Sequence, residues 1–158
     1  MRNLLLLCLI CVVATSCGNG NKSLIQHHFN ALNRHDLKQL VADYDAKAQV
    51  TSSGWDGIHN GTGEVNKAYS RYFHATPDLR FDIGNVYFSS DSVAVVEYTQ
   101  SGTLAAPEHG EPTYMAGKKY ILNTCTIFTI KNSKIVKETT YFDQVSFLRQ
   151  VGFFEHLK

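Results

Sequence analysis

Residues 134–152, which read KIVKETTYFDQVSFLRQVG, are the most informative stretch of the chain. The first half of this stretch alternates between apolar and polar residues with a period of two, as a β-strand does, and ends in Thr140-Tyr141-Phe142-Asp143. Phe147 and Leu148 then open a short helical pattern. The stretch therefore predicts a long last strand that ends at an aspartate, followed at once by a short helix.

Similar strand patterns fill the region before it. Residues 79–88 and 92–103 predict two strands joined by a Ser-Ser-Asp turn, and residues 119–130 pair in the same way with 135–143 across Asn132-Ser133. Both pairs are antiparallel hairpin candidates. Residues 104–117 form the long irregular connection, and we expect it at the open end of the sheet, where such loops often cover a site.

Helical patterns occupy the first half of the chain. One apolar stripe begins near residue 23, and a second follows Asp36, which forms a capping-box pattern with Gln39. A third helix ends before Pro77. The apolar stripe of the first helix consists of Ile25, Phe29 and Leu32, that of the second of Leu37, Leu40, Val41 and Tyr44, and that of the third of Val65, Ala68, Tyr69, Tyr72 and Phe73. A first strand is expected at residues 49–53, with a glycine-rich loop at 54–63 after it.

Helices followed by four long strands predict a single α+β domain. In such a domain a curved antiparallel sheet wraps around helices that pack on one of its faces, which gives a cone. The mouth of a cone of this kind is the expected place for a small-molecule pocket.

The N-terminus has the layout of a secretory signal peptide over residues 1–16. Arg2 is followed by a ten-residue apolar run, Leu4–Val13, and small residues then lead into Cys17. A permanent membrane anchor is the alternative, but a spanning helix needs about 20 apolar residues. Small residues before a cysteine resemble the lipobox of bacterial lipoproteins, although Ala14 stands where leucine is more frequent. We therefore expect lipid on Cys17, a flexible tether at 17–22, a folded domain at 23–155, and a location in the bacterial cell envelope facing the periplasm.

The cysteine count agrees with this processing. Cys8 and Cys11 leave with the signal peptide and Cys17 carries lipid, so only Cys125 stays inside the mature domain. No intrachain disulfide is then available. A chain of about 130 residues can bury some two-thirds of its surface, which is enough for a core without disulfides. Cys125 is expected as a small buried residue.

Several classes of function lack their sequence features. The formal net charge is +1, from 15 basic and 14 acidic residues, and no basic run indicates nucleic-acid binding. Seven histidines show no spacing typical of metal ligands, so no metal site is predicted. The segment Gly18–Ser23 (GNGNKS) lacks the glycine and the preceding strand of a phosphate-binding loop. No serine-hydrolase elbow is present.

Three ordered segments carry a family resemblance. The closing segment at 134–152, the opening Phe29-Asn30-Ala31-Leu32-Asn33, and the junction Pro77-Asp78-Leu79-Arg80-Phe81 together resemble SnoaL-like polyketide cyclases of the nuclear transport factor 2-like superfamily. The resemblance covers about residues 24–153. It implies the cone-shaped α+β fold, no cofactor, and homodimerisation through the exposed sheet face. It does not fix an activity, because this superfamily includes cyclases, isomerases, hydrolases and non-catalytic proteins.

In the cyclases an aspartate at the end of the last strand acts as general acid and base, and Asp143 matches that position. The resemblance implies that Asp143 lies in an apolar pocket with a raised pKa and transfers a proton. The alternative is that Asp143 caps the following helix, which would lower its pKa. Both roles are open at this point.

Further pocket residues follow from position alone. The candidates for ligand contact are Tyr44, Trp55, Tyr72, Tyr98, Asn123 and Tyr141. The expected function is a cyclase or isomerase acting on a small apolar carbonyl compound, or else a non-catalytic ligand-binding or assembly module of the same fold.

Overall fold

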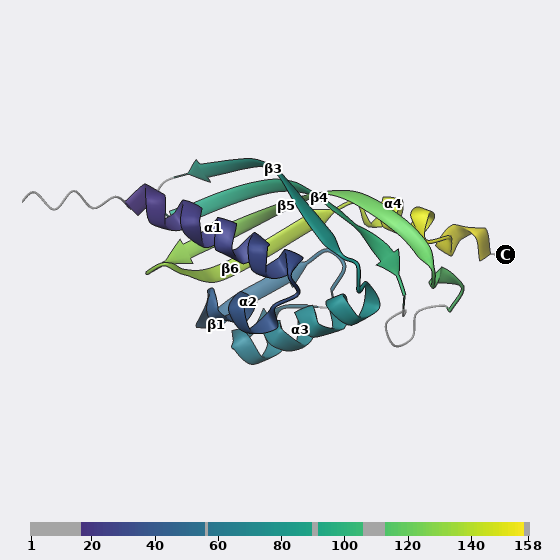
Figure 1. The fold of residues 1–158 in the computed structure, drawn as a ribbon, viewed down its shortest axis with the longest axis horizontal. Coiled ribbons are helices and arrows are strands. Elements are labelled where there is room, and N and C mark those ends of the chain that lie inside the picture. Colours follow the sequence, from purple (N-terminus) through teal and green to yellow (C-terminus); the bar gives the residue numbers. More distant parts are fainter. Residues whose placement is uncertain (1–16, 56, 90–91, 106–112, 157–158) are drawn as a thin grey trace, which may run out of the picture.

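The computed structural model describes residues 17–55, 57–89, 92–105 and 113–156. The predicted signal peptide at 1–16 lies outside the described residues. Along the chain the elements are α1 (Cys17–Asn33), α2 (Leu37–Ala42), β1 (Tyr44–Ser52), β2 (His59–Asn60), α3 (Gly61–Ala75), β3 (Arg80–Ser89), β4 (Val93–Leu104), η2 (Thr113–Met115), β5 (Lys118–Lys131), β6 (Lys134–Phe142), α4 (Gln144–Gln150) and η3 (Phe153–His156) (Figure 1).

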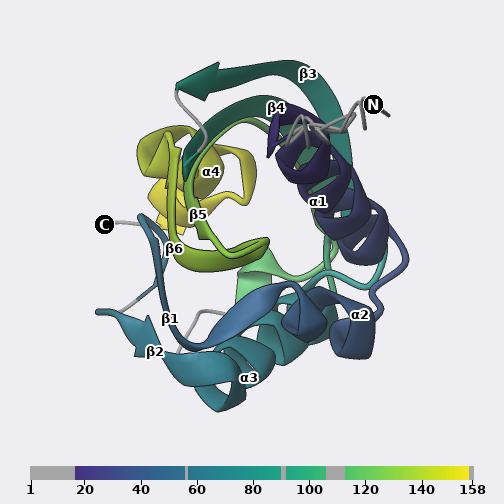
Figure 2. The same ribbon diagram turned by 90° about the vertical axis from the view of Figure 1, so that its left-hand side faces the viewer.

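The six strands form one curved sheet in the order β2-β1-β6-β5-β4-β3. Strands β3 to β6 pair as antiparallel neighbours, whereas β1 joins β6 in parallel, with Val50 opposite Glu138. The sheet curls around an interior that α1 closes on one side and α3 on another (Figure 2). The predicted α+β fold with a cone-shaped sheet is confirmed.

Alternation along the strands puts one face of the sheet into the core. On β5 the even-numbered residues from Tyr120 to Ile130 point inward and are buried, and the odd-numbered residues point outward. Phe128 of β5 and Phe29 of α1 meet in this core with their ring centroids 6.3 Å apart, and each is only 1% exposed. The packing of α1 inside the curved sheet therefore fixes which strand face is the inner one.

The predicted elements agree with the observed ones over most of the chain. The four long strands begin and end within two residues of their predicted positions. Asp36 caps α2 as predicted, because its Oδ1 accepts from the amide of Gln39 at 3.0 Å. One prediction is wrong at the end of α2: this helix stops at Ala42, and Tyr44 begins β1.

The first helix is longer than the sequence pattern predicts. Residues 18–22, predicted as a flexible tether, belong to α1, which begins at Cys17. Asn21 is already 6% exposed, so packing starts within this segment. Among the described helices, none is long and apolar enough to cross a membrane.

Candidate ligand-binding site

A cavity of about 120 Å³ opens at the end of the cone where the last strand meets α4. We call it the mouth cavity. Its lining residues come from the end of β1, from α3, from the inner faces of β4 and β5, and from the start of α4: Ser52, Gly54, Trp55, Tyr72, Ala75, Thr76, Gln100, Leu104, Tyr120, Leu122, Phe142, Gln144, Phe147 and Leu148. None of these lining residues is an aspartate, glutamate, lysine, arginine or histidine.

Aromatic rings form much of the wall. Trp55 meets Tyr72 edge to face at 6.2 Å between ring centroids, and Phe147 meets Tyr120 in the same way at 5.1 Å. Rings arranged like this present flat apolar surfaces to a ligand and contribute beyond the area they bury. The wall therefore suits a flat, apolar ring.

Polar groups in the wall already have partners. The amide of Gln100, whose side chain is buried, donates to the Tyr72 hydroxyl, and the hydroxyls of Thr76 and Tyr120 lie 3.0 Å apart. Burial raises the pKa of Tyr120 above its usual value, so this hydroxyl stays neutral at physiological pH. The cavity wall thus carries a few neutral hydrogen-bonding groups, and an oxygen atom of a ligand would have to share or replace their present partners.

A second, smaller space of about 20 Å³ adjoins the mouth cavity deeper in the cone. We call it the inner chamber. The two spaces share Ser52, Trp55, Tyr72 and Gln100, and the inner chamber also touches Tyr98 and Thr140. A space of at least about 10–15 Å³ with two or more polar neighbours can hold one water molecule. The inner chamber is large enough for one water or one ligand oxygen.

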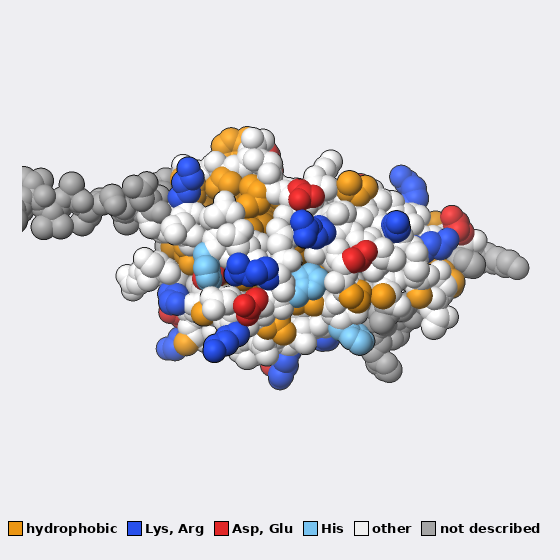
Figure 3. All heavy atoms as spheres, in the orientation of Figure 1, with side chains coloured by type: hydrophobic (Ala, Val, Ile, Leu, Met, Phe, Trp, Pro, Cys, Tyr) orange, Lys and Arg blue, Asp and Glu red, His pale blue; other side chains and the backbone are white. Residues whose placement is uncertain are grey.

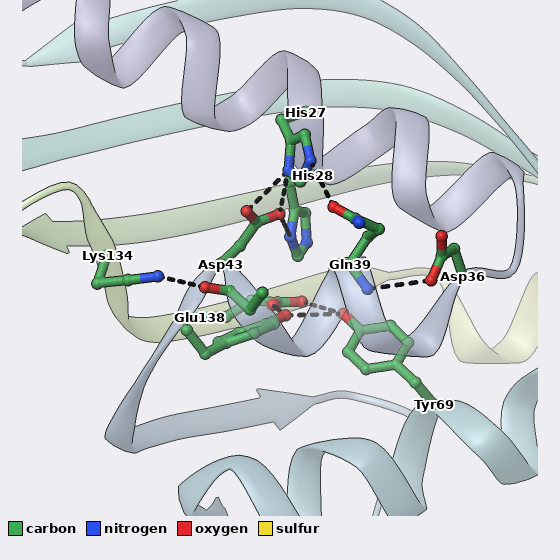
Figure 4. Close-up of polar contacts among 10 residues, drawn as sticks. His27, His28, Asp36, Gln39, Asp43, Tyr69, Lys134 and Glu138 are labelled. Atoms are coloured by element: carbon green, nitrogen blue, oxygen red, sulfur yellow. Dashed lines mark hydrogen bonds and ion pairs between the residues drawn. The ribbon is translucent and has the colours of Figure 1, made fainter.

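A buried carboxylate lies behind the inner chamber. Glu138 is 3% exposed, and its two carboxylate oxygens accept hydrogen bonds from the hydroxyls of Tyr44 and Tyr69, the latter at 2.7 Å (Figure 4). Desolvation, with the nearby Glu138 charge, raises the pKa of both tyrosines well above the usual value. Both tyrosines are therefore neutral donors to Glu138.

From Glu138 a line of hydroxyl groups leads to the inner chamber. The Thr140 hydroxyl donates to the Glu138 carboxylate at 3.3 Å and lies 2.8 Å from the Thr126 hydroxyl. The Thr126 hydroxyl in turn lies 3.0 Å from the Tyr98 hydroxyl. Glu138 itself does not line either cavity. It positions the hydroxyls of Tyr69 and Thr140, which do line the inner chamber.

A second polar group lies at the junction of α1, α2 and β1. Asp43 is 5% exposed and contacts His27 Nδ1 at 2.8 Å, while the fully buried His28 has its Nδ1 3.4 Å from the other Asp43 oxygen (Figure 4). The ring of His28 packs edge-on against Tyr44 and Phe128. Within the described residues, no group of three or more His, Cys, Asp or Glu side chains is arranged to hold a metal ion.

The structure brings four of the predicted ligand residues to the interior. Trp55 and Tyr72 line both spaces, and Tyr98 lines the inner chamber. Tyr44 is buried as well, but it faces Glu138 and lines neither space.

The other two predicted ligand residues point away from the cavity. Asn123 and Tyr141 lie on the outer face of the sheet, where they border a solvent-open depression together with Cys125. Tyr141 is 55% exposed. Cys125 is half-buried rather than buried, because odd-numbered residues of β5 face outward. A homodimer through this outer face stays a prediction.

Asp143 lies at the N-cap position of α4. Its Oδ1 accepts from the amide of Ser146 at 3.0 Å, its side chain is exposed, and it is not among the residues that line the mouth cavity. This geometry favours the capping alternative. The implied role in proton transfer stays a prediction, since no described contact links this carboxylate to the cavity lining.

Sequence reasoning missed Gln100, Tyr120 and Glu138. The first two could have been found, because each shares a strand face with apolar residues that repeat every second position. Glu138 was hidden by an irregularity in the pairing of β5 with β6, which puts both Ile135 and Glu138 inward although they are three residues apart.

Comparison with known proteins agrees with this geometry. A family model described as a SnoaL-like domain matches residues 25–138, which is more than half of the chain. The chain belongs to the SnoaL-like domain family. This confirms the resemblance found in the sequence. No match is found among curated proteins.

Solved structures share the fold of this SnoaL-like domain at low sequence identity. One is a proposed polyketide cyclase from Xanthomonas campestris pv. campestris, with a TM-score of 0.77 and 21% identity over 86% of this chain and 99% of that chain. Another is TsrD from Streptomyces laurentii, with a TM-score of 0.73 and 20% identity over 85% of this chain and 96% of that chain. A third is IdmH from Streptomyces antibioticus, also a proposed polyketide cyclase, with a TM-score of 0.70 and 17% identity over 84% of this chain and 98% of that chain. At such identities the likeness shows the fold alone.

Proposed function

We propose that this SnoaL-like domain is a lipid-anchored binding module that holds a small, neutral, largely apolar molecule in the mouth cavity. The observation that carries the proposal is that all the described residues lining that cavity are uncharged. An ionised ligand would lose its hydration there without gaining a partner of opposite charge, which costs several kcal/mol or more. A neutral ligand has no such cost.

The size of the cavity supports a ligand of about one ring. An apolar cavity of about 150 Å³ accepts benzene, and the mouth cavity has about 120 Å³. The rings of Trp55 and Phe147 would contact the flat faces of such a ligand, and Gln100 and Tyr120 are placed to reach a carbonyl or hydroxyl oxygen on it. A compound of several fused rings would require the walls to move.

Binding without catalysis is the alternative that the geometry supports better. General acid or base catalysis needs a titratable group within hydrogen-bond reach of the reacting proton. Asp143 is exposed and caps α4, and Glu138 lies behind Tyr69 and Thr140. The cyclase or isomerase function suggested by the resemblance would therefore require Asp143 to leave its cap.

The single tryptophan of the chain, Trp55, provides the test. Neutral single-ring phenols and ketones, and their charged carboxylate counterparts, are titrated into the protein while the fluorescence of Trp55 is followed. We expect neutral compounds to change the emission saturably and the carboxylates to bind at least tenfold more weakly, since about 1.4 kcal/mol corresponds to a factor of ten.

Matched variants show where the compounds bind. Ala75→Phe places a ring in the mouth cavity and should abolish binding, whereas Tyr141→Ala on the outer face should leave it unchanged. Thermal unfolding confirms that both variants are folded. Equal affinity for the charged compounds, or binding that survives in Ala75→Phe but is lost in Tyr141→Ala, would show that the mouth cavity is not the site.

A further inference from the structure

The two ends of the cone carry different features. At one end lie the first turn of α1 at Cys17, the last residues of β3, and the turn from Lys131 to Lys134 (Figure 1). We call this end the anchor end. The mouth cavity lies at the other end, beside α4.

Strand pairing fixes which turns meet at the anchor end. Ser89 at the end of β3 pairs with Val93, Val93 pairs with Thr129, and Lys131 pairs with Lys134. The end of β3 and the β5–β6 turn therefore lie at the same end of the sheet, with β4 between β3 and β5.

The direction of α1 follows from its last residue. Asn33 exchanges two hydrogen bonds of 2.8 Å with the backbone of Phe81, near the start of β3. Cys17 lies at the opposite end of this 17-residue helix, about 25 Å away at 1.5 Å per residue. Helix α1 thus runs from the anchor end toward the mouth end.

The surface at the anchor end has exposed apolar and basic side chains. Val86, Tyr87 and Phe88 of β3 are 37%, 53% and 41% exposed, and apolar side chains gather on the surface over β3 and α1 (Figure 3). Lys131 and Lys134 are exposed on the turn between β5 and β6, where the Lys134 ammonium also donates to the backbone carbonyl of Ala42. Aromatic and basic side chains together are typical of surfaces that rest in the headgroup region of an anionic membrane.

Two acidic groups at this end have hydrogen-bond partners within the domain. Asp43 is buried against His27, and the Asp45 carboxylate accepts from the amide of Lys47 at 2.9 Å. Asp91, in the connection after β3, lies outside the described residues.

We propose that the anchor end rests on an anionic lipid bilayer, with Tyr87, Phe88, Lys131 and Lys134 at the headgroups, so that the mouth cavity faces away from the membrane. This inference rests on the proposed lipid at Cys17. A ligand then reaches the mouth cavity from the aqueous phase and not from within the bilayer.

Depth-dependent fluorescence quenching tests the orientation. The full chain is produced in a lipoprotein-processing bacterium and reconstituted into phosphatidylethanolamine–phosphatidylglycerol vesicles with acyl-chain-brominated lipids. Trp55→Phe removes the only native tryptophan, and in that background Phe88→Trp probes the anchor end and Val145→Trp probes α4 at the mouth end. Both probe sites are exposed, at 41% and 54%.

We expect the brominated lipids to quench most of the Phe88→Trp emission and none of the Val145→Trp emission. Equal quenching of both probes, or quenching of Val145→Trp alone, would overturn the proposal. Absence of quenching at both sites in protein that still floats with the vesicles would also overturn it, because the domain would then stand away from the bilayer.

Two further variants separate the causes. Lys131→Glu with Lys134→Glu should weaken quenching of the anchor-end probe only in vesicles that contain phosphatidylglycerol, whereas Lys118→Glu with Lys119→Glu, near the mouth, should have no effect. No difference between the two pairs would refute the role of the headgroup charge. If wild type and Cys17→Ala both fail to float, the lipid anchor itself is absent, which rejects the anchored module independently of the quenching result.

Discussion

Four buried tyrosines should make this domain unstable at alkaline pH. Tyr44, Tyr69, Tyr98 and Tyr120 are 3%, 4%, 8% and 4% exposed, and burial raises the pKa of each hydroxyl above its usual value. A raised folded-state pKa means that the folded protein holds protons that the unfolded chain releases. The stabilisation is complete below the pKa of an unfolded tyrosine, about 10, and it is lost as the pH rises from there toward the folded-state pKa.

The size of the effect follows from the number of groups. Each tyrosine that is ionised only in the unfolded state lowers the free energy of unfolding by up to about 1.4 kcal/mol per pH unit. Four such groups give at most about 5 to 6 kcal/mol per pH unit above about pH 10. A domain with a stability of about 5–15 kcal/mol would then unfold within a few pH units.

Urea unfolding at a series of pH values from neutral to strongly alkaline measures this slope. Tyr98→Phe should reduce the slope by about one quarter, as one of four groups is removed, and Tyr87→Phe, at a 53% exposed position, should leave it unchanged. A wild-type slope no steeper than that of one group, or an equal loss of slope in both variants, would refute the reasoning.

Three other perturbations test separate parts of the structure. Asp143→Ala should lower the free energy of unfolding by about 1 kcal/mol and Asp143→Asn by much less, because asparagine also caps helices; equal losses in chemical denaturation would contradict the capping role. Gly102→Ala would place a Cβ 2.3 Å from Thr76 Cγ2 and should lower the free energy of unfolding by about 1–3 kcal/mol. The loss should be smaller in a Thr76→Ser background, which lacks this methyl group. An equal loss in both backgrounds would count against the clash. Phe128→Ala, at a 1% exposed site, should cost about 3–5 kcal/mol, and a loss under about 1 kcal/mol in the same assay would show that this part of the core is loosely packed.

Much of the fold could be predicted because local patterns coincide with the packing. Buried and more exposed residues alternate along β5 from Tyr120 onward, and turn residues such as Asn132 and Ser133, both with positive φ, mark the end of this strand. The end of α2 was not visible in the same way. Tyr44 continues the helical spacing from Leu40, but its hydroxyl bonds to Glu138, and this contact between residues 94 positions apart depends on the tertiary fold.

The candidate site was less predictable than the fold. Trp55 and Tyr72 could be predicted from their positions, because Trp55 is on the loop after a strand end and Tyr72 is on a helix face, and both border the mouth of the cone. The sequence around Asn123 and Tyr141 does not show which face of each strand is buried, and a shift of one residue moves a side chain to the opposite face. Asp143 matches a family position, but one carboxylate can either cap a helix or face a pocket, and the local sequence permits both.

The parallel pairing of β1 with β6 also has a consequence for how the chain folds. Thr51 lies opposite Thr139, so the sheet closes only when segments almost 90 residues apart in sequence have met. Loop closure over such distances makes folding slow, and the rate falls as the mean sequence separation of contacts rises. During synthesis, the edge of β1 that pairs with β6 stays unpaired until residues 134–142 have left the ribosome. Chains truncated before residue 134 should therefore expose an unpaired strand edge and aggregate.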